Sequence, residues 1–326
     1  MKNTFKKLFY KYERKAGFAF LVGGFIFDTL TLQRIDLLWE NLVFIFYLTL
    51  VFVGIVAINA KDGKYTGAVS YAMQFAFGGL FSGFLVFYSR SGSLTASFPF
   101  FLMLSVFFVG NEFFREKYKL FNFRLAVFFV AVFSYFTFSF PILLRRLGAD
   151  IFVLSGLASL AVIFLLSVFL KRKANFLIIG GIYLLFNILY FTNLIPPIPL
   201  SLKEGGIYRF VERANEDYIL HREEWKWYEF WRANEFKFRP GEPLYAYTAI
   251  FAPTKIEAQI FHSWSFFDEE KNEWMESVRI GFPIAGGRDG GYRGYSVKES
   301  VWPGKWRVDA VNSRGQIIGR IKFDVI

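Results

Sequence analysis

The chain has 326 residues, of which 54% are hydrophobic and 20% are charged, and its formal net charge is +11. It contains no cysteine, which excludes disulfides, thiolate metal sites and cysteine nucleophiles. Residues 1–200 carry 19 Lys and Arg against 8 Asp and Glu, whereas residues 201–326 carry 19 of each. The positive charge therefore belongs to the apolar half, and we expect no nucleic-acid partner.

Seven apolar runs fill the first two hundred residues: 16–33, 38–59, 67–89, 94–111, 122–143, 150–170 and 175–195. Each is close to the roughly 20 residues that a helix needs to cross a bilayer. None shows the polar stripe of a soluble amphipathic helix. The predicted fold class is therefore a membrane all-α domain at 1–200, with about seven transmembrane helices in membrane lipid, followed by a soluble domain at 201–326.

The cations predict the orientation of these helices. Fifteen of the 19 lie in the N-terminal segment and in the second, fourth and sixth connections, and four lie in the other connections. The positive-inside rule then places the N-terminus in the cytoplasm, and an odd number of spans places residues 201–326 outside. We expect a bacterial inner membrane protein with a periplasmic or extracellular C-terminal domain. A cleaved signal peptide is the alternative for residues 1–33, but no small-x-small cleavage site follows.

Two features of the helical half need explanation. Asp28 is a carboxylate well inside an apolar run, and it either pairs with Arg34 or Arg90 or binds an ion or substrate. Three prolines in the segment 196–199 end the last helix, and they predict a short, semi-rigid spacer before the second domain.

The second half alternates with the period of a β-strand. Apolar residues occupy every second position in the segments 256–264, 306–310 and 317–325. Turn signals separate these segments, at 239–241, 268–272, 286–291, 303–304 and 312–315. Six to eight short strands predict an all-β, sandwich-like antiparallel domain at 201–326. The stretch 212–231 fits a strand pair or a short helix.

A set of motifs follows in order: His262-Ser263-Trp264, the segment 291–296 (Gly-Tyr-Arg-Gly-Tyr-Ser), the segment 303–309 (Pro-Gly-Lys-Trp-Arg-Val-Asp) and Phe323-Asp324-Val325. This order resembles an uncharacterised bacterial domain-of-unknown-function family whose members carry such a C-terminal module, often behind several membrane spans. The resemblance covers about residues 244–326. Members usually have Thr where this chain has Gly294. The resemblance implies architecture and no particular chemistry.

Few residues suggest catalysis. The histidines are His221 and His262, and neither stands in a metal-binding spacing, so we expect no metal site and no cofactor. His262 shares a strand face with Ile260 and Trp264, which favours a core histidine over a ligand. The serines lack the G-x-S-x-G pattern of a nucleophile elbow.

One acidic stretch leaves two interpretations open. Its carboxylates Glu223, Glu224 and Glu229 alternate with Trp and Tyr residues. Paired carboxylates and aromatic rings can line a carbohydrate cleft. Aromatic residues also gather at membrane interfaces, and an interfacial belt is the favoured interpretation.

The favoured function is a non-enzymatic envelope protein whose β-domain binds a protein, glycan or lipid-linked partner. The candidate contacts are Trp225, Trp227, His262, Trp264, Arg293, Tyr295 and Trp302. A transporter or channel is an alternative if Asp28, Asn59, Gln74 and Asn187 face one path. A membrane-embedded enzyme acting on envelope polymers is another, and it requires acidic residues near His262 or Glu223.

Overall fold

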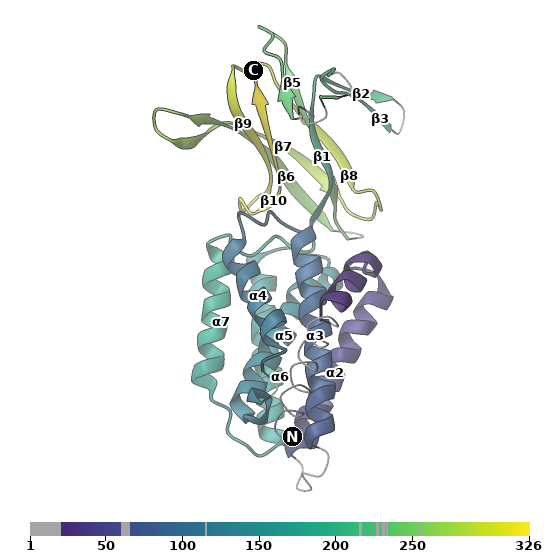
Figure 1. Ribbon diagram of the computed structural model, residues 1–326, viewed down its shortest axis with the longest axis vertical. Coiled ribbons are helices and arrows are strands. Elements are labelled where there is room, and N and C mark those ends of the chain that lie inside the picture. Colours follow the sequence, from purple (N-terminus) through teal and green to yellow (C-terminus); the bar gives the residue numbers. More distant parts are fainter. Residues whose placement is uncertain are drawn as a thin grey trace, which may run out of the picture. The chain divides into compact units, whose positions relative to one another are not determined.

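The computed structural model describes residues 21–59, 66–114, 116–214, 217–225, 228–229, 232, 234–253 and 256–326. The chain forms two compact units, a helical one and a β-rich one (Figure 1). The helical unit runs to Ser89 and includes Phe98–Leu144 and Gly148–Thr192. The β-rich unit consists of Asn193–Ile326 together with the connections Arg90–Ser97 and Arg145–Leu147.

The described parts of all seven predicted runs contain helix. The helices are α2 (Leu38–Asn59), α3 (Thr66–Arg90), α4 (Phe98–Gly110), α5 (Phe121–Leu144), α6 (Ala149–Phe169) and α7 (Phe176–Phe191), with an apolar helix at Leu21–Thr31 and a 3-10 turn at Lys117–Lys119. By length and composition, α2, α3, α5 and α6 can cross a membrane. The described helix at Leu21–Thr31, α4 and α7 are apolar but shorter than these four helices. α4 has 13 residues and α7 has 16.

Aromatic side chains build the core of the helical unit. α5 is the central helix and packs against α2, α6 and α7. The rings of Phe44, Phe84 and Phe138 meet between α2, α3 and α5, with centroids 5.3 to 6.0 Å apart. Gly83 leaves room for this contact, since a Cβ there would lie 2.5 Å from the Phe44 ring. Close approach at glycine is a common way for apolar helices to pack.

The surface of the helical unit is also apolar. In α2, 22% of the most apolar window is buried inside the unit. Large side chains such as Leu38, Phe46 and Val53 are exposed. A helix that is apolar on its exposed side is stable only against another apolar medium.

The β-rich unit contains two sheets and a hairpin (Figure 1). The three-stranded sheet has the order β1 (Ser201–Tyr208), β5 (Leu244–Phe251), β8 (Tyr292–Lys298). The five-stranded sheet has the order β4 (Glu235–Phe236), β10 (Ile317–Val325), β9 (Gly304–Asn312), β6 (Glu257–Asp268), β7 (Glu273–Ala285). The hairpin is β2 (Phe210–Ala214) and β3 (Asp217–His221), so the first part of the ambiguous stretch is a strand pair. Neighbouring strands are antiparallel, except that β4 and β10 are parallel.

The inner faces of the two sheets share one core. As the alternation predicts, Ile260 and Trp264 of β6 are completely buried. Trp264 belongs to a cluster with Trp306 from its own sheet and with Leu244 and Ala246 from the three-stranded sheet. Residues from both sheets therefore exclude water from a common interior.

A β-bulge in β10 changes one predicted face. The alternation places Ile318 on the outer face, but Ile318 is buried and lies in a core cluster. The pairing of β10 with β9 shifts register between Ile317 and Gly319, and an extra residue of this kind reverses the side-chain direction. Gly319 then lies against Leu202, whose side chain occupies the space of a Cβ.

The three prolines lie in a segment that follows α7 and belongs to the β-rich unit, which includes Asn193–Ile326. α7 ends at Phe191, and the segment begins at Asn193. The side chain of Asn193 donates to the Arg314 carbonyl over 3.1 Å, and the side chain of Gln316 donates to the Ile195 carbonyl over 3.1 Å. These two hydrogen bonds attach the segment to the turn between β9 and β10.

Gly291 provides a test of the fold. It has φ of +84°, and a Cβ there would lie 2.9 Å from the backbone of Ile250. We expect Gly291→Ala to lower the free energy of unfolding by about 1–3 kcal/mol, because both backbone strain and crowding oppose it. The measurement is thermal unfolding of the full chain in detergent, followed by tryptophan fluorescence.

The neighbouring Gly290 is the matched control, since nothing lies within 4 Å of its Cβ position. Gly290→Ala is expected to unfold at the wild-type temperature. Equal unfolding temperatures for the two variants would contradict the turn geometry.

Candidate functional site

A polar contact lies buried between the two sheets. His262 of β6 forms hydrogen bonds with Thr248 of β5, between Nε2 and Oγ1 (2.8 Å), and with Ser296 of β8, between Nδ1 and Oγ (2.9 Å). The indole N–H of Trp264 donates to the same Ser296 Oγ over 2.9 Å. All four residues are buried. We call them the inter-sheet polar network.

This network is unsuited to catalysis. A neutral imidazole donates one hydrogen bond and accepts the other, so both hydroxyls satisfy it without a charge. Burial lowers the pKa of His262 to about 3, which makes it a poor general base near neutral pH. His262 and Trp264 are both 0% exposed, and the ring N–H groups and nitrogens of both residues have partners within the network.

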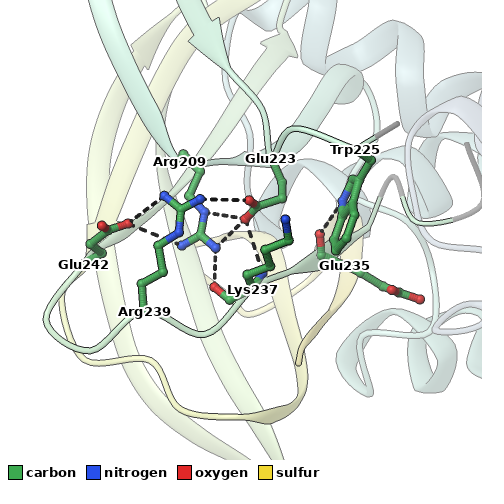
Figure 2. Close-up of polar contacts among 7 residues, drawn as sticks. All are labelled: Arg209, Glu223, Trp225, Glu235, Lys237, Arg239 and Glu242. Atoms are coloured by element: carbon green, nitrogen blue, oxygen red, sulfur yellow. Dashed lines mark hydrogen bonds and ion pairs between the residues drawn. The ribbon is translucent and has the colours of Figure 1, made fainter. Parts of the chain in front are cut away.

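Glu223 is the centre of a second polar cluster (Figure 2). Arg209 Nε donates to Glu223 Oε2 over 2.6 Å, and Arg239 Nη2 donates to Oε1 over 3.1 Å. The backbone N–H of Lys237 donates to Oε2 over 3.2 Å. Arg239 Nη1 also forms an ion pair with Glu242 Oε2 at 3.1 Å. Both oxygens of the buried carboxylate therefore have cationic or amide partners.

The three carboxylates of the acidic stretch have different surroundings. Glu223 is 9% exposed and is bound as above, whereas Glu224 beside it is exposed. Glu229 forms an ion pair with Arg232 at 3.3 Å. In the part of the chain that the structure describes, no group of three or more His, Asp and Glu residues could hold a metal ion. The Glu223 cluster joins the loop after β3 to Arg209, which lies between β1 and β2, and to Lys237 and Arg239, which follow β4.

Arg293 and Tyr295 come together on the outer face of the three-stranded sheet. They lie two residues apart on β8, and their partners on β5 are Ala249 and Tyr247. Arg293 Nη1 donates to Asp217 Oδ1 of the hairpin over 2.6 Å. This hydrogen bond raises the pKa of Arg293 further, so its guanidinium stays charged.

Five tyrosines cover this outer face, which we call the tyrosine face. They are Tyr208, Tyr218, Tyr245, Tyr247 and Tyr295, and neighbouring ring centroids lie 5.5 to 6.2 Å apart. Burial raises the pKa of Tyr247 to about 12, and the charge of Glu204 acts in the same direction. Tyr295 is 41% exposed. The face offers phenol groups, exposed ring area and the guanidinium of Arg293, and the guanidinium of Arg222 lies over the Tyr208 ring at 5.5 Å.

Trp225 and Trp302, two further candidate contacts, have partners outside the tyrosine face. Trp225 donates its N–H to the Glu235 carbonyl over 3.2 Å, and Arg232 and Lys237 stack on its ring. Trp302 packs on Phe266 and Trp306, with centroids 4.8 and 4.6 Å away. Trp227 lies outside the described residues. Among the candidates that the structure describes, Arg293 and Tyr295 lie together on the tyrosine face, and Trp225 and Trp302 contact other residues.

Asp28 has a different partner from those expected. Ser82 of α3 donates to its Oδ2 over 2.5 Å. Arg34 forms an ion pair with Asp36 at 2.7 Å. A hydroxyl donor compensates the carboxylate only partly, so the binding of an ion or substrate at Asp28 stays a prediction.

The four polar residues proposed for a transport path bind separate partners. Besides the contact of Asp28 with Ser82, Asn59 accepts from Arg124, Gln74 donates to the Asn111 carbonyl and Asn187 donates to the Tyr183 carbonyl. Within the described residues, no hydrogen bond joins any two of the four.

Sequence reasoning missed Thr248 and four of the five tyrosines. Tyr245 and Tyr247 lie two residues apart, the spacing that places side chains on one strand face, and Arg293 and Tyr295 repeat that spacing. This repeated spacing was the available signal. Gly294, which replaces the usual Thr of the resembling family, lies where a Cβ would be 2.6 Å from the Phe282 ring. Phe282 therefore fills the space of that side chain.

Comparison with known families supports the resemblance in the C-terminal region. The family model described as "Protein of unknown function (DUF2914)" matches residues 257–325, which span β6 to β10. No curated protein matches the chain.

Solved structures give weaker similarities. An immunoglobulin-like protein from Pseudomonas aeruginosa is 10% identical with a TM-score of 0.24, covering 39% of this chain and 96% of that one. A β-glucosidase from Listeria innocua is 10% identical with a TM-score of 0.22, covering 39% of this chain and 16% of that one. An alkylpurine DNA glycosylase from Pseudomonas fluorescens is 9% identical with a TM-score of 0.25, and the similarity covers 90% of this chain and 99% of that one. TM-scores this low do not establish a shared fold.

The inter-sheet polar network predicts a pH dependence of stability. His262 has a pKa of about 3 in the folded chain and an ordinary value of 6.5. Between these two pH values the unfolded chain binds a proton at this histidine and the folded chain does not. The contribution of His262 to the free energy of unfolding is complete above pH 6.5. As the pH falls below 6.5, this contribution decreases by about 1.4 kcal/mol per pH unit. Denaturant unfolding of the full chain between pH 7 and 4 measures this slope.

His221, on the exposed strand β3, is the control. His221→Gln is expected to keep the wild-type slope, whereas His262→Gln removes the histidine part of it. An unchanged slope in His262→Gln would show that other groups cause the acid sensitivity.

Glu223→Ala is expected to lower the free energy of unfolding by about 3 kcal/mol, because it leaves Arg209 and Arg239 without their shared carboxylate. Glu224→Ala, one residue away and exposed, should change it by less than about 0.5 kcal/mol. Chemical denaturation of both variants provides the measurement. A small effect at position 223 would mean that water replaces the carboxylate.

Proposed function

We propose that this protein is an integral inner-membrane protein of the bacterial envelope with about seven spans. In this proposal its β-sandwich lies outside the cytoplasm and binds a protein, glycan or lipid-linked partner. The helical unit anchors the binding domain and has no transport role.

The apolar surface of the helices supports the membrane part. Four described helices have the length and composition of membrane spans, and α2 is apolar yet mostly unburied. Such a surface would be unstable in water. The fifteen-to-four distribution of cations supports a cytoplasmic N-terminus and an outside C-terminus.

The tyrosine face is the observation that carries the binding role. It combines exposed ring area at Tyr295 with the charged Arg293, and neither is needed to fill the core. Tyrosine and arginine are the residue types that contribute most at binding surfaces. By contrast, His262 and Glu223 are enclosed by their own structural partners.

The alternatives lack such support. A transporter would bring its intramembrane polar groups to one path, but Asp28, Gln74 and Asn187 bind separate partners. An enzyme acting on envelope polymers would need a free acidic group near His262 or Glu223. His262 faces hydroxyls and Glu223 faces arginines.

A two-part experiment in cells tests the proposal. Compartment reporters at the two ends of the full chain should place the N-terminus in the cytoplasm and the C-terminus outside. A photo-crosslinking phenylalanine analogue at Tyr295 should then capture one discrete envelope partner. The readout is a cross-linked band with a reproducible composition.

Phe238 is the control position, since it is 40% exposed and Tyr295 is 41% exposed. The same analogue at Phe238 should capture no discrete partner. If the reporters place both ends in the same compartment, the proposed orientation, with the N-terminus in the cytoplasm and the C-terminus outside, is wrong. Identical products from positions 238 and 295 contradict the tyrosine face as the binding surface.

A further inference from the structure

The outer face of the five-stranded sheet carries cations stacked on aromatic rings. Arg279 lies over the Phe261 ring at 4.4 Å, Arg307 over the Trp274 ring at 4.6 Å and Lys305 over the Phe267 ring at 5.8 Å. The three cations come from β7 and β9, and the rings come from β6 and β7. We call these three pairs, together with Lys322 of β10, the cation ladder.

The strand register places these residues on one face. Ser263 of β6 pairs with Arg279 on β7 and with Asp309 on β9, and Arg307 pairs with Lys322 on β10. Directly opposed residues in antiparallel strands lie on the same side of the sheet. The residues on either side of Ser263, His262 and Trp264, are in the core, so the ladder faces outward.

The face also carries Arg320 and the carboxylates of Glu257, Glu276, Asp309 and Asp324, so the individual hydrogen bonds and ion pairs decide which cations are compensated. Asp309 is held by Arg320 through two hydrogen bonds of 2.6 and 2.7 Å, and Arg307 reaches it only at 3.8 Å. Burial lowers the pKa of Arg307, and the charge of Arg320 acts in the same direction. The Nε of Arg307 has no hydrogen-bond partner.

The other cations have still less compensation. Arg279 donates to the Asn312 carbonyl over 3.1 Å, which is a neutral acceptor. Glu276, the nearest acid to it on β7, accepts from Ser263 over 2.6 Å. Asp324 is opposite Lys305 in register. In the part of the chain that the structure describes, no carboxylate lies within 4 Å of the charged group of Arg279, Lys305 or Lys322.

We propose that the cation ladder binds an acidic polysaccharide, a polymer with carboxylates repeated along its sugar chain. The face is a continuous sheet of four neighbouring strands, so its cations are spread over about 15 Å at roughly 4.8 Å per strand. A linear polymer with regularly spaced anions matches this spread better than a single small anion. Guanidinium groups bind carboxylates through two parallel N–H donors.

The stacking explains why a polyanion is favoured over a lipid surface. Phe261 and Trp274 are covered by guanidinium groups, so their rings do not project to enter a bilayer. The rings hold the cations in place, which reduces the side-chain entropy lost on binding. The inference rests on the proposed function in one respect: an envelope glycan reaches this face only if the β-rich unit lies outside.

Binding of purified full-length protein to polygalacturonate tests the ladder. We expect saturable binding at low ionic strength that weakens as salt is added, and no binding to neutral dextran. The double variant Arg279→Gln and Arg307→Gln should bind about tenfold more weakly, since two charge contacts are lost, one from the exposed Arg279 and one from Arg307, whose side chain is 20% exposed. Tryptophan fluorescence checks that it folds. If it does not fold, Lys305→Gln with Lys322→Gln, both at exposed positions, replaces it.

A charge-matched double variant is the control. Lys203 lies over the Phe251 ring at 5.3 Å and Arg288 over the Tyr292 ring at 5.4 Å, and both are outside the ladder. Lys203→Gln with Arg288→Gln should bind polygalacturonate as the wild type does. If the two double variants lose polygalacturonate binding equally, the net charge of the protein and not the cation ladder determines binding, and the proposal is wrong.

Two further outcomes would overturn the proposal. Wild-type protein that does not bind polygalacturonate would exclude the acidic glycan. Tighter binding to polyglutamate than to polygalacturonate would point to an acidic peptide instead. Neither outcome affects the sidedness test or capture at Tyr295, so the proposed function fails or stands by itself.

Discussion

The polar contact between His262, Ser296, Trp264 and Thr248 constrains the whole β-rich unit. Apolar burial is nondirectional, so it would allow the two sheets to slide over one another. The inter-sheet polar network prevents such sliding, because a shift of one sheet would leave buried polar groups without hydrogen-bond partners. Each unpaired group would cost about 1–3 kcal/mol. Ser296 joins two residues of β6 through one oxygen. This contact therefore fixes how the two sheets face each other, and everything on their outer faces follows.

Once the inner faces are fixed, alternation decides the outer ones, and they differ in chemistry. The three-stranded sheet presents the tyrosine face with Arg293, and the five-stranded sheet presents the cation ladder. Aromatic rings are used differently on the two faces. Tyr295 exposes ring area, whereas Trp274 supports the guanidinium of Arg307. One small domain can thus offer a largely neutral surface and a cationic surface to different ligands.

The motifs behind the family resemblance are explained by structure. His262, Trp264 and Ser296 form the inter-sheet network, and Trp306 fills the core that they close. These residues all lie within the region 257–325 that the family model matches. The binding residues proposed here lie on the opposite faces of the same strands, where the fold places fewer demands on residue type.

The sequence by itself determined the helical runs, the main strands and turns, the inward face of β6 and the unequal distribution of charge, because these depend on local periodicity and composition. It did not determine the burial of Ile318, since a bulge is a property of paired strands. Nor did it show that Glu223 binds two arginines or that Arg307 stacks on Trp274. Only the tertiary structure decided these contacts, because strand order and register bring together residues that are far apart in the chain.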